Sequence, residues 1–166
     1  GRDNFTGQDV ANITRYDVIG EPNNFKGIEG NHNGTKKVPS KALGVKLKKD
    51  SETYNVVVAH LISKRSSNDD KRAAQADAIV RHLNGKTGHN IVMGDLNDTP
   101  GSTTLNLLVK SGLNVINDKE YSYTYQNKKM LIDHILISDS LKPGATFKSF
   151  DLGAISDHRA VIATLK

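Results

Sequence analysis

The sequence predicts a single α/β domain built on a mixed β-sheet. Apolar runs rich in β-branched residues, such as residues 54–61 and 90–96, are typical of buried strands. Residues 68–83 and 103–110 instead show the apolar spacing of helices that pack through one face. Strands and helices follow one another without strict alternation, which favours a mixed sheet over a purely parallel one. The 166 residues are about the size of one domain and can bury a real core.

The predicted elements each carry a local signal. Residues 21–39 are rich in Asn, Gly and Lys and predict a long polar loop. The first helix has Asn68 or Asp69 as a capping residue and Gly85 to end it. Its apolar face consists of Ala73, Ala76, Ile79, Val80 and Leu83. The predicted strands cover residues 43–48, 54–61, 90–96, 121–125, 130–138 and 158–165.

The composition limits the classes of function. The chain has no cysteine, which excludes disulfides, thiolate metal sites and cysteine nucleophiles. No apolar run approaches the roughly 20 residues that span a bilayer, so we expect no membrane partner. The net charge is +5 and the pI is near 9.3, which is compatible with a polyanionic partner and equally with an ordinary basic surface.

The stretch NIVMGDLNDTP (residues 90–100) ends an apolar strand in polar residues. Asp95 and Asn97 lie two residues apart, so an extended chain would place both side chains on the same side. Two neighbouring oxygen-bearing groups at a strand end favour a metal ion or a phosphate. The same residues also favour an ordinary turn, because Asp and Asn bond to their own backbone.

Three other segments place polar residues where apolar ones are expected. His60 ends a Val-rich run, Asp133 and His134 lie within MLIDHILIS, and Asp157 and His158 directly precede an apolar strand. Each has a structural interpretation, because a His at a strand end or a buried Asp often only satisfies nearby hydrogen-bonding groups.

Together these residues indicate a catalytic site. A strand-embedded Asp costs several kcal/mol unless it is paired. An Asp–His pair fixes the imidazole tautomer and raises the His pKa. Asp95, Asn97 and Asp157 add the hard oxygen ligands that Mg²⁺ prefers. Oxygen ligands with imidazoles suit hydrolysis of a phosphodiester, in which an Asp activates water and a His stabilises the added charge.

Four motifs in this order resemble the endonuclease/exonuclease/phosphatase superfamily, which includes deoxyribonuclease I. They are VVVAHLISK, GDLND, IDHILIS and SDHRAV, at residues 56–64, 94–98, 132–138 and 156–161. The resemblance implies a sandwich of two mixed β-sheets flanked by helices.

Three further segments are similar to the bacterial extracellular-nuclease branch of that superfamily. They are KRAAQA at residues 71–76, YSYTY at residues 121–125, and residues 1–16, in which GQDV at residues 7–10 would open a strand. This branch favours a secreted bacterial protein.

The resemblance implies a role for each matching residue. Asp95 would orient and activate the attacking water, and Asn97 would hold the scissile phosphate or the ion. Asp95, Asn97 and Asp157 would form the metal site, with Mg²⁺ expected and Mn²⁺ or Ca²⁺ as alternatives.

Histidines and a lysine complete the implied site. His158 would bind the phosphate and its developing charge, with Asp133 as its orienting partner. His60 would be a second phosphate-facing histidine, and Lys41 would lie beside a phosphate. We expect His134 to be structural, because it neighbours Asp133 in a strand and so points to the other face.

The chain departs from the superfamily pattern in its N-terminal part. Members carry a metal-binding Glu in a Gln-Glu pair near the start of the domain, and this chain has no such pair. We therefore expect residues 1–166 to be one domain that lacks its N-terminal strands. An incomplete sheet would leave an open edge, so a homodimer or a partner chain that completes the sheet is a further prediction.

The expected function is a divalent-metal-dependent phosphodiesterase acting on nucleic acid, with DNA as the expected substrate and little sequence specificity. One alternative is a phosphatase or phospholipase-type phosphodiesterase of the same superfamily. The other is an inactive remnant that binds nucleic acid or a protein partner, which the missing Glu would favour.

Overall fold

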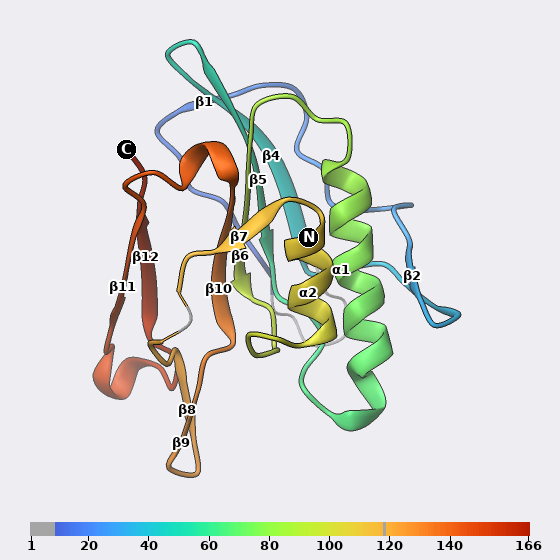
Figure 1. Ribbon diagram of the computed structural model, residues 1–166, viewed down its shortest axis with the longest axis vertical. Helices are drawn as coiled ribbons and strands as arrows, with labels where there is room; N and C mark the ends of the chain where they lie inside the picture. Colours follow the sequence, from blue (N-terminus) through green and yellow to red (C-terminus); the bar gives the residue numbers. More distant parts are fainter. Residues whose placement is uncertain (1–8, 118) are drawn as a thin grey trace.

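The structure is a computed structural model in which residues 9–117 and 119–166 are described. Its centre is a six-stranded sheet in the order β1-β4-β5-β6-β10-β7 (Figure 1). The strands are β1 (Asp17–Val18), β4 (Ala42–Lys49), β5 (Glu52–Ala59), β6 (His89–Asp95), β10 (Asp133–Ser138) and β7 (Leu113–Val115). β5 and β6 pair in parallel and the other neighbours pair antiparallel, so the predicted mixed sheet is confirmed.

Two helices cover one face of this sheet (Figure 1). They are α1 (Asp69–Leu83), which follows the 3-10 turn η1 (Ser66–Asn68), and α2 (Thr103–Lys110). The Ser102 side chain caps α2 by accepting a hydrogen bond from the Leu105 amide. The main core lies between helices and sheet and includes Val57, Val92, Leu136, Ala76, Ile79, Leu105 and Leu108. Neither helix of the described residues is long and apolar enough to cross a membrane.

A two-stranded hairpin covers part of the opposite face. It consists of β11 (Thr146–Phe150) and β12 (Ala160–Thr164), with the short 3-10 turns η2 (Asp139–Leu141) and η3 (Gly153–Ile155) before and within it. Phe147, Val161 and Ala163 pack here against Ile135 and Ile137 of β10. The fold is thus of the expected α/β class, with this hairpin as the second layer of β-structure in the described part of the chain.

The loop prediction for residues 21–39 was partly wrong. This segment contains the hairpin of β2 (Gly30–His32) and β3 (Thr35–Lys37), which packs on α1. Phe25 is fully buried, with its ring 4.7 Å from that of His82. Gly30 lies so close to the α1 backbone at Ala74 that a Cβ would clash, so the polar composition conceals a packed hairpin.

The predicted C-terminal strands are shifted or broken in the structure. Residues 123–130 form a small hairpin, β8 (Tyr123–Tyr125) with β9 (Lys128–Met130), before β10 begins at Asp133. The sequence reasoning missed β1, β7 and β11, because their short or polar runs carry weak alternation. Residues 7 and 8 of the expected N-terminal strand lie outside the described residues.

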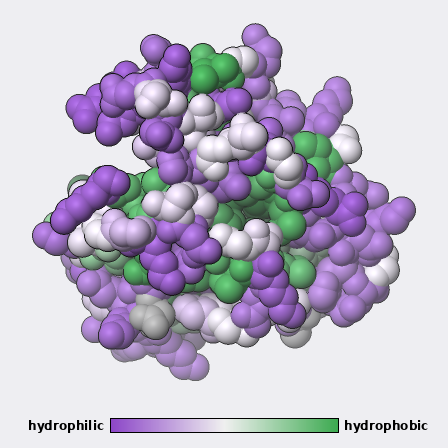
Figure 2. Space-filling view, turned by 45° about the horizontal axis from the view of Figure 1, so that its top comes forward, coloured by the Kyte–Doolittle hydropathy of each residue, from purple (hydrophilic) through white to green (hydrophobic). Residues whose placement is uncertain are grey.

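The oligomeric prediction remains a prediction. In the view of Figure 2 hydrophilic residues cover most of the surface, with apolar residues gathered toward the middle of the face. The exposed large apolar side chains include Phe150, Ile155 and Ile162 on or beside the β11–β12 hairpin. Measurement of the molar mass in solution tests whether this region binds a second copy.

Candidate active site

The sheet topology gathers three chain segments at one edge. β5 and β6 are parallel, so their carboxyl ends meet at the same edge, where His60 follows β5 and Asp95 ends β6. β10 runs antiparallel to β6 and begins at this edge with Asp133, which pairs in register with Asp95. Segments 38 residues apart in sequence thus place two carboxylates side by side.

Strand alternation decides which face these side chains occupy. Asp95 and Asp133 have the same parity as Met93 and Ile135, which lie on the β11–β12 side of the sheet. His134 lies on the helix side, fully buried, with Nε2 2.8 Å from the carbonyl oxygen of Asp98. The orientation expected for His134 is therefore confirmed.

Two Asp–His pairs meet at the site. His158 Nδ1 lies 2.8 Å from Asp133 Oδ2, and His60 Nε2 lies 3.5 Å from Asp95 Oδ2. The hydrogen bond to Asp133 is the main cause that raises the pKa of His158, although partial burial opposes it. His158 is therefore biased toward the cationic form, which suits it to an anionic ligand.

Asp95 is held in an unfavourable environment for a charge. Burial and the nearby charge of Asp133 raise its pKa to about 6, against the effect of a hydrogen bond from the Asn97 amide. Such a carboxylate gains most from a cation or from a proton taken from water. This is the environment in which general bases are found.

Asn97 contacts Asp95 through a turn and not through strand alternation. Its backbone adopts the left-handed conformation, with φ 52°. The amide N donates to Asp95 Oδ1 at 2.8 Å, and Nδ2 donates to Asp95 Oδ2 at 3.1 Å and to the Leu61 carbonyl at 2.9 Å. The residues that form the turn are thus also the residues of the candidate site. Asp95 and Asn97 lie close together as predicted, but the turn and not strand alternation brings them together.

A cavity of about 460 Å³ opens over these groups. Its walls include His60, Asp95, Asn97 and His158 from the predicted set. They also include Ser63, Lys64, Tyr123, Tyr125, Met130 and Ile132, for which the sequence reasoning had assigned no role.

Three predicted residues, Lys41, Asp133 and Asp157, lie outside this lining. Asp133 is linked to it through its hydrogen bond to His158. The carbonyl of Lys41 accepts the His60 amide at 2.8 Å, so Lys41 borders the site at the start of β4. Asp157 is exposed, and its carbonyl accepts the Thr124 amide at 3.2 Å. Asp157 influences His158 electrostatically, but its carboxylate is not grouped with those of Asp95 and Asp133.

The carboxylates fit a hard divalent cation. Ligand atoms of Asp95, Asp133 and His158 lie within 4.8 Å of one another among the described residues. Carboxylate oxygens are the donors that Mg²⁺ and Mn²⁺ prefer, with water completing the shell. His158 Nδ1 already bonds to Asp133, so the imidazole is better placed as a partner of a carboxylate than as a ligand.

Buried polar contacts fix the loops that carry His60 and Asn97. Arg72 of α1 is fully buried, and its guanidinium bonds to Asp98 at 3.1 Å and to the carbonyls of Ile62 and Ser63. Gln75, one turn later, accepts the Ile62 amide at 2.9 Å. The KRAAQA segment therefore anchors this side of the site. The signal was present in the sequence, because Arg72 and Gln75 fall among the apolar positions of the helix.

The other side is fixed by Ser122 and by one glycine. The Ser122 hydroxyl is buried and accepts the amides of Ile132 at 3.0 Å and Asp133 at 2.9 Å. Gly94, with φ 127°, approaches the Ala59 carbonyl so closely that a Cβ would clash. The glycine of GDLND is thus required for β6 to bring Asp95 beside β5.

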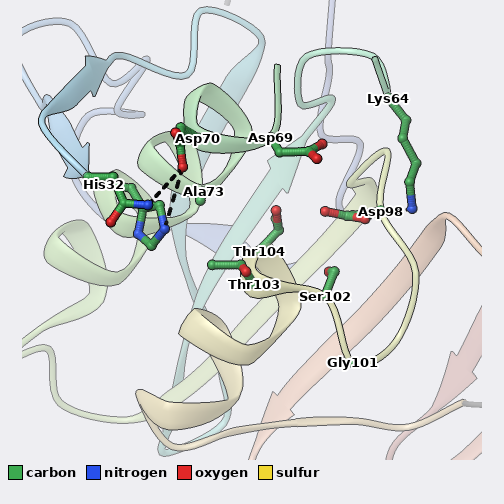
Figure 3. A pocket seen from close by; sticks show the side chains of 11 residues that line it. His32, Lys64, Asp69, Asp70, Ala73, Asp98, Gly101, Ser102, Thr103 and Thr104 are labelled. Atoms are coloured by element: carbon green, nitrogen blue, oxygen red, sulfur yellow. Dashed lines mark hydrogen bonds and ion pairs between the residues drawn. The ribbon is translucent and has the colours of Figure 1, made fainter. Parts of the chain in front are cut away.

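A second cavity adjoins the first at the N-terminal ends of α1 and α2 (Figure 3). Lys64 and Asp98 line it together with Asp69 and Asp70, and Asp70 pairs with His32 at 3.8 Å. Lys64 also lines the first cavity, and its ammonium bonds to Asp98 at 2.9 Å. The acidic groups of this second cavity are thus paired with basic side chains, because Arg72 also pairs with Asp69.

Comparison with known proteins agrees with this geometry. The sequence pattern of the endonuclease/exonuclease/phosphatase family matches residues 4–158. The chain belongs to this family. The comparison with curated protein sequences gave no match.

Solved structures share the fold. The human nocturnin catalytic domain with a bound sulfate anion has a TM-score of 0.65 and 20% identity, over 92% of this chain and 61% of that one. D. rerio TDP2 humanized by 14 mutations has a TM-score of 0.60 and 16% identity, over 75% of this chain and 60% of that one. The endonuclease domain of TRAS1, a telomere-specific retrotransposon, has a TM-score of 0.59 and 14% identity, over 75% and 63%. The chain spans about three fifths of the length of these structures, and the fold is of the deoxyribonuclease I-like class.

Proposed function

We propose that this family member is a divalent-metal-dependent phosphodiesterase that hydrolyses nucleic acid, with DNA as the substrate and little sequence specificity. The observation that carries the proposal is the meeting of the His60–Asp95 and Asp133–His158 pairs at one site, where His60, Asp95 and His158 line a cavity. Family membership and the folds of TDP2 and the TRAS1 endonuclease domain support a nuclease over other phosphoesterases. One solved structure of D. rerio TDP2 carries a single-strand DNA product.

Each residue then has a role in the hydrolysis. Asp95, which lines the cavity, orients the attacking water and takes its proton. Cationic His158, oriented by Asp133, donates a hydrogen bond to a phosphoryl oxygen as negative charge develops there. Asn97 and His60 hold the other side of the phosphate.

A bound divalent ion would supply Lewis-acid stabilisation of the phosphoryl group. Asp95 and Asp133 would hold it, with Mg²⁺ as the proposed ion and Mn²⁺ or Ca²⁺ as alternatives. The roles predicted for Asn97 and Asp157 at the ion, and for Lys41 at a phosphate, remain proposals. Their test is the loss of metal-dependent activity in the corresponding alanine variants.

The first experiment is nicking of supercoiled plasmid in Mg²⁺, in Mn²⁺, in Ca²⁺ and in chelator. We expect nicking that requires a metal and that falls at least about 100-fold in His158→Ala, as for loss of a positioned acid–base group. His89→Ala is the matched control, because His89 lies at the opposite end of β6 and pairs with Glu52.

The outcomes separate the candidate functions. Absence of nicking in every metal, together with binding of the same DNA, would favour the inactive nucleic-acid-binding remnant. Hydrolysis of small phosphate esters without DNA cleavage would favour the phosphatase or phospholipase alternative.

A further inference from the structure

One wall of the active-site cavity carries two parallel aromatic rings. Tyr123 and Tyr125 both belong to β8 and line the cavity. Their ring centroids are 6.4 Å apart and their planes differ by 6°. Residues two apart on a strand share a face, so β8 presents both rings to the same side. The outer ring, Tyr125, is 55% exposed.

The inner ring connects this wall to the catalytic groups. The Tyr123 ring lies 4.6 Å from the imidazole of His158, which itself bonds to Asp133. Tyr123 also forms an isolated β-bridge with His158. A row of rings therefore leads from the proposed phosphate position outward along the β8–β9 hairpin, which projects from the molecule in Figure 1.

The hairpin does not need these rings for a core. β8 and β9 contain three residue pairs, and Tyr123 faces Met130 across the hairpin, while Tyr125 faces Lys128. Exposing a large aromatic face to water is unfavourable unless a ligand covers it. Two lysines lie near the rings, since Lys128 lies opposite Tyr125 and Lys64 lines the same cavity.

Aromatic faces beside the proposed phosphate site suit a nucleobase. Bases stack on aromatic side chains in a way that tolerates any sequence, because every base has a π-face. In a duplex the faces of a base are covered by its neighbours, so stacking on a protein ring requires an unpaired base.

We propose that Tyr123 and Tyr125 form a stacking platform for an unpaired base next to the scissile phosphate. The chain would then act on single-stranded nucleic acid, or on unpaired ends and gaps, in preference to intact duplex. This inference rests on the proposed function, which it deepens by naming the substrate class.

The test removes the Tyr125 ring from the protein and, separately, a base from the ligand. Fluorescence anisotropy in chelator measures the Kd of a labelled single-stranded oligonucleotide, of its duplex, and of an abasic single strand of equal length. We expect Tyr125→Ala to weaken binding of the normal single strand about 10- to 100-fold. Binding of the abasic strand should change by less than about twofold, because no base is left to stack. Tyr125→Trp should restore binding of the normal strand, and Tyr125→Leu should not.

The control is Tyr16→Ala, which removes an exposed tyrosine next to β1, at the far side of the sheet. Equal loss of affinity for the normal and abasic strands in Tyr125→Ala would overturn the platform and assign Tyr125 to hairpin structure. Equal affinity for single strand and duplex in the parent chain would also overturn it. Because these measurements need no hydrolysis, a chain that binds through Tyr125 but fails to nick DNA would contradict the proposed function and leave the platform supported.

Discussion

The two sides of the active site are held in place by different kinds of contact. On the α1 side, charged groups are buried, because Arg72 is fully buried and Asp98 is 5% exposed. On the β8–β9 side, Ser122 holds Asp133 through neutral hydrogen bonds, and Tyr125 is left exposed. The first side is therefore expected to control stability, and the second to control which ligands bind.

On the α1 side, hydrogen bonds stabilise the charged form of Asp98. Burial would raise the pKa of Asp98, but hydrogen bonds from Lys64, Thr104 and Arg72 outweigh it and lower that pKa below its ordinary value. The fold therefore stabilises the charged form of Asp98. It destabilises the charged form of Asp95, whose pKa is raised to about 6, and we attribute this cost to the function of Asp95. Breaking either side should show which residues serve each purpose.

The largest effect on stability is expected from Arg72→Met. The substitution keeps the side-chain volume but leaves Asp98 buried without its guanidinium partner, which costs about 3–5 kcal/mol of unfolding free energy. Urea unfolding measures the loss. Arg81→Met is the control, since Arg81 lies on the same helix in a pair with Asp77 but is 58% exposed, and such pairs contribute at most about 1 kcal/mol. Similar losses in the two variants would show that burial of Arg72 is not what stabilises this side.

A smaller effect is expected from Ser122→Ala. The change leaves the buried amides of Ile132 and Asp133 without their acceptor, which costs about 1–3 kcal/mol. Because the Asp133 backbone is one of the two groups released, kcat for DNA nicking should fall more than KM changes. Ser51→Ala, at the exposed turn between β4 and β5, should change neither quantity. A stability loss with unchanged kcat would mean that β10 alone positions Asp133.

The sequence predicted the polar residues of this site better than the residues that hold them in place. Asp95, Asp133 and His158 stand out because a charged or imidazole group interrupts or borders an apolar strand. Strand periodicity also assigned His134 to the opposite face. Such signals are local, so they survive without knowledge of the sheet order.

The pattern marks Arg72 as a polar residue among apolar positions, but it does not encode which groups Arg72 contacts. Arg72 reaches Asp98 across 26 residues, and the loop geometry that makes this reach short is set by packing of α1 on the sheet. The platform was hidden because YSYTY reads as one strand, whereas only Tyr123–Tyr125 is extended and paired with β9. The placement of Asp157 on the surface likewise follows from how the segment before β12 pairs antiparallel with β8.

An effect of opposite sign is expected from Asp95→Asn. Asp95 has a folded pKa of about 6, above its ordinary value of 3.8, so the folded chain binds the extra proton more tightly than the unfolded chain. The charged form therefore costs stability above pH 6, and that cost disappears as the pH falls through about 6 toward 3.8. In chelator, Asp95→Asn should be more stable than the parent chain at pH 8 and equally stable near pH 4. Urea unfolding at pH 8, 6 and 4 measures the difference, and a difference that does not change with pH would contradict the assigned environment of Asp95.

Addition of Mg²⁺ at pH 8 should raise the stability of the parent chain and not that of the variant, because only the parent chain retains both carboxylates for the ion. Stabilisation of both chains by Mg²⁺ would place the ion elsewhere.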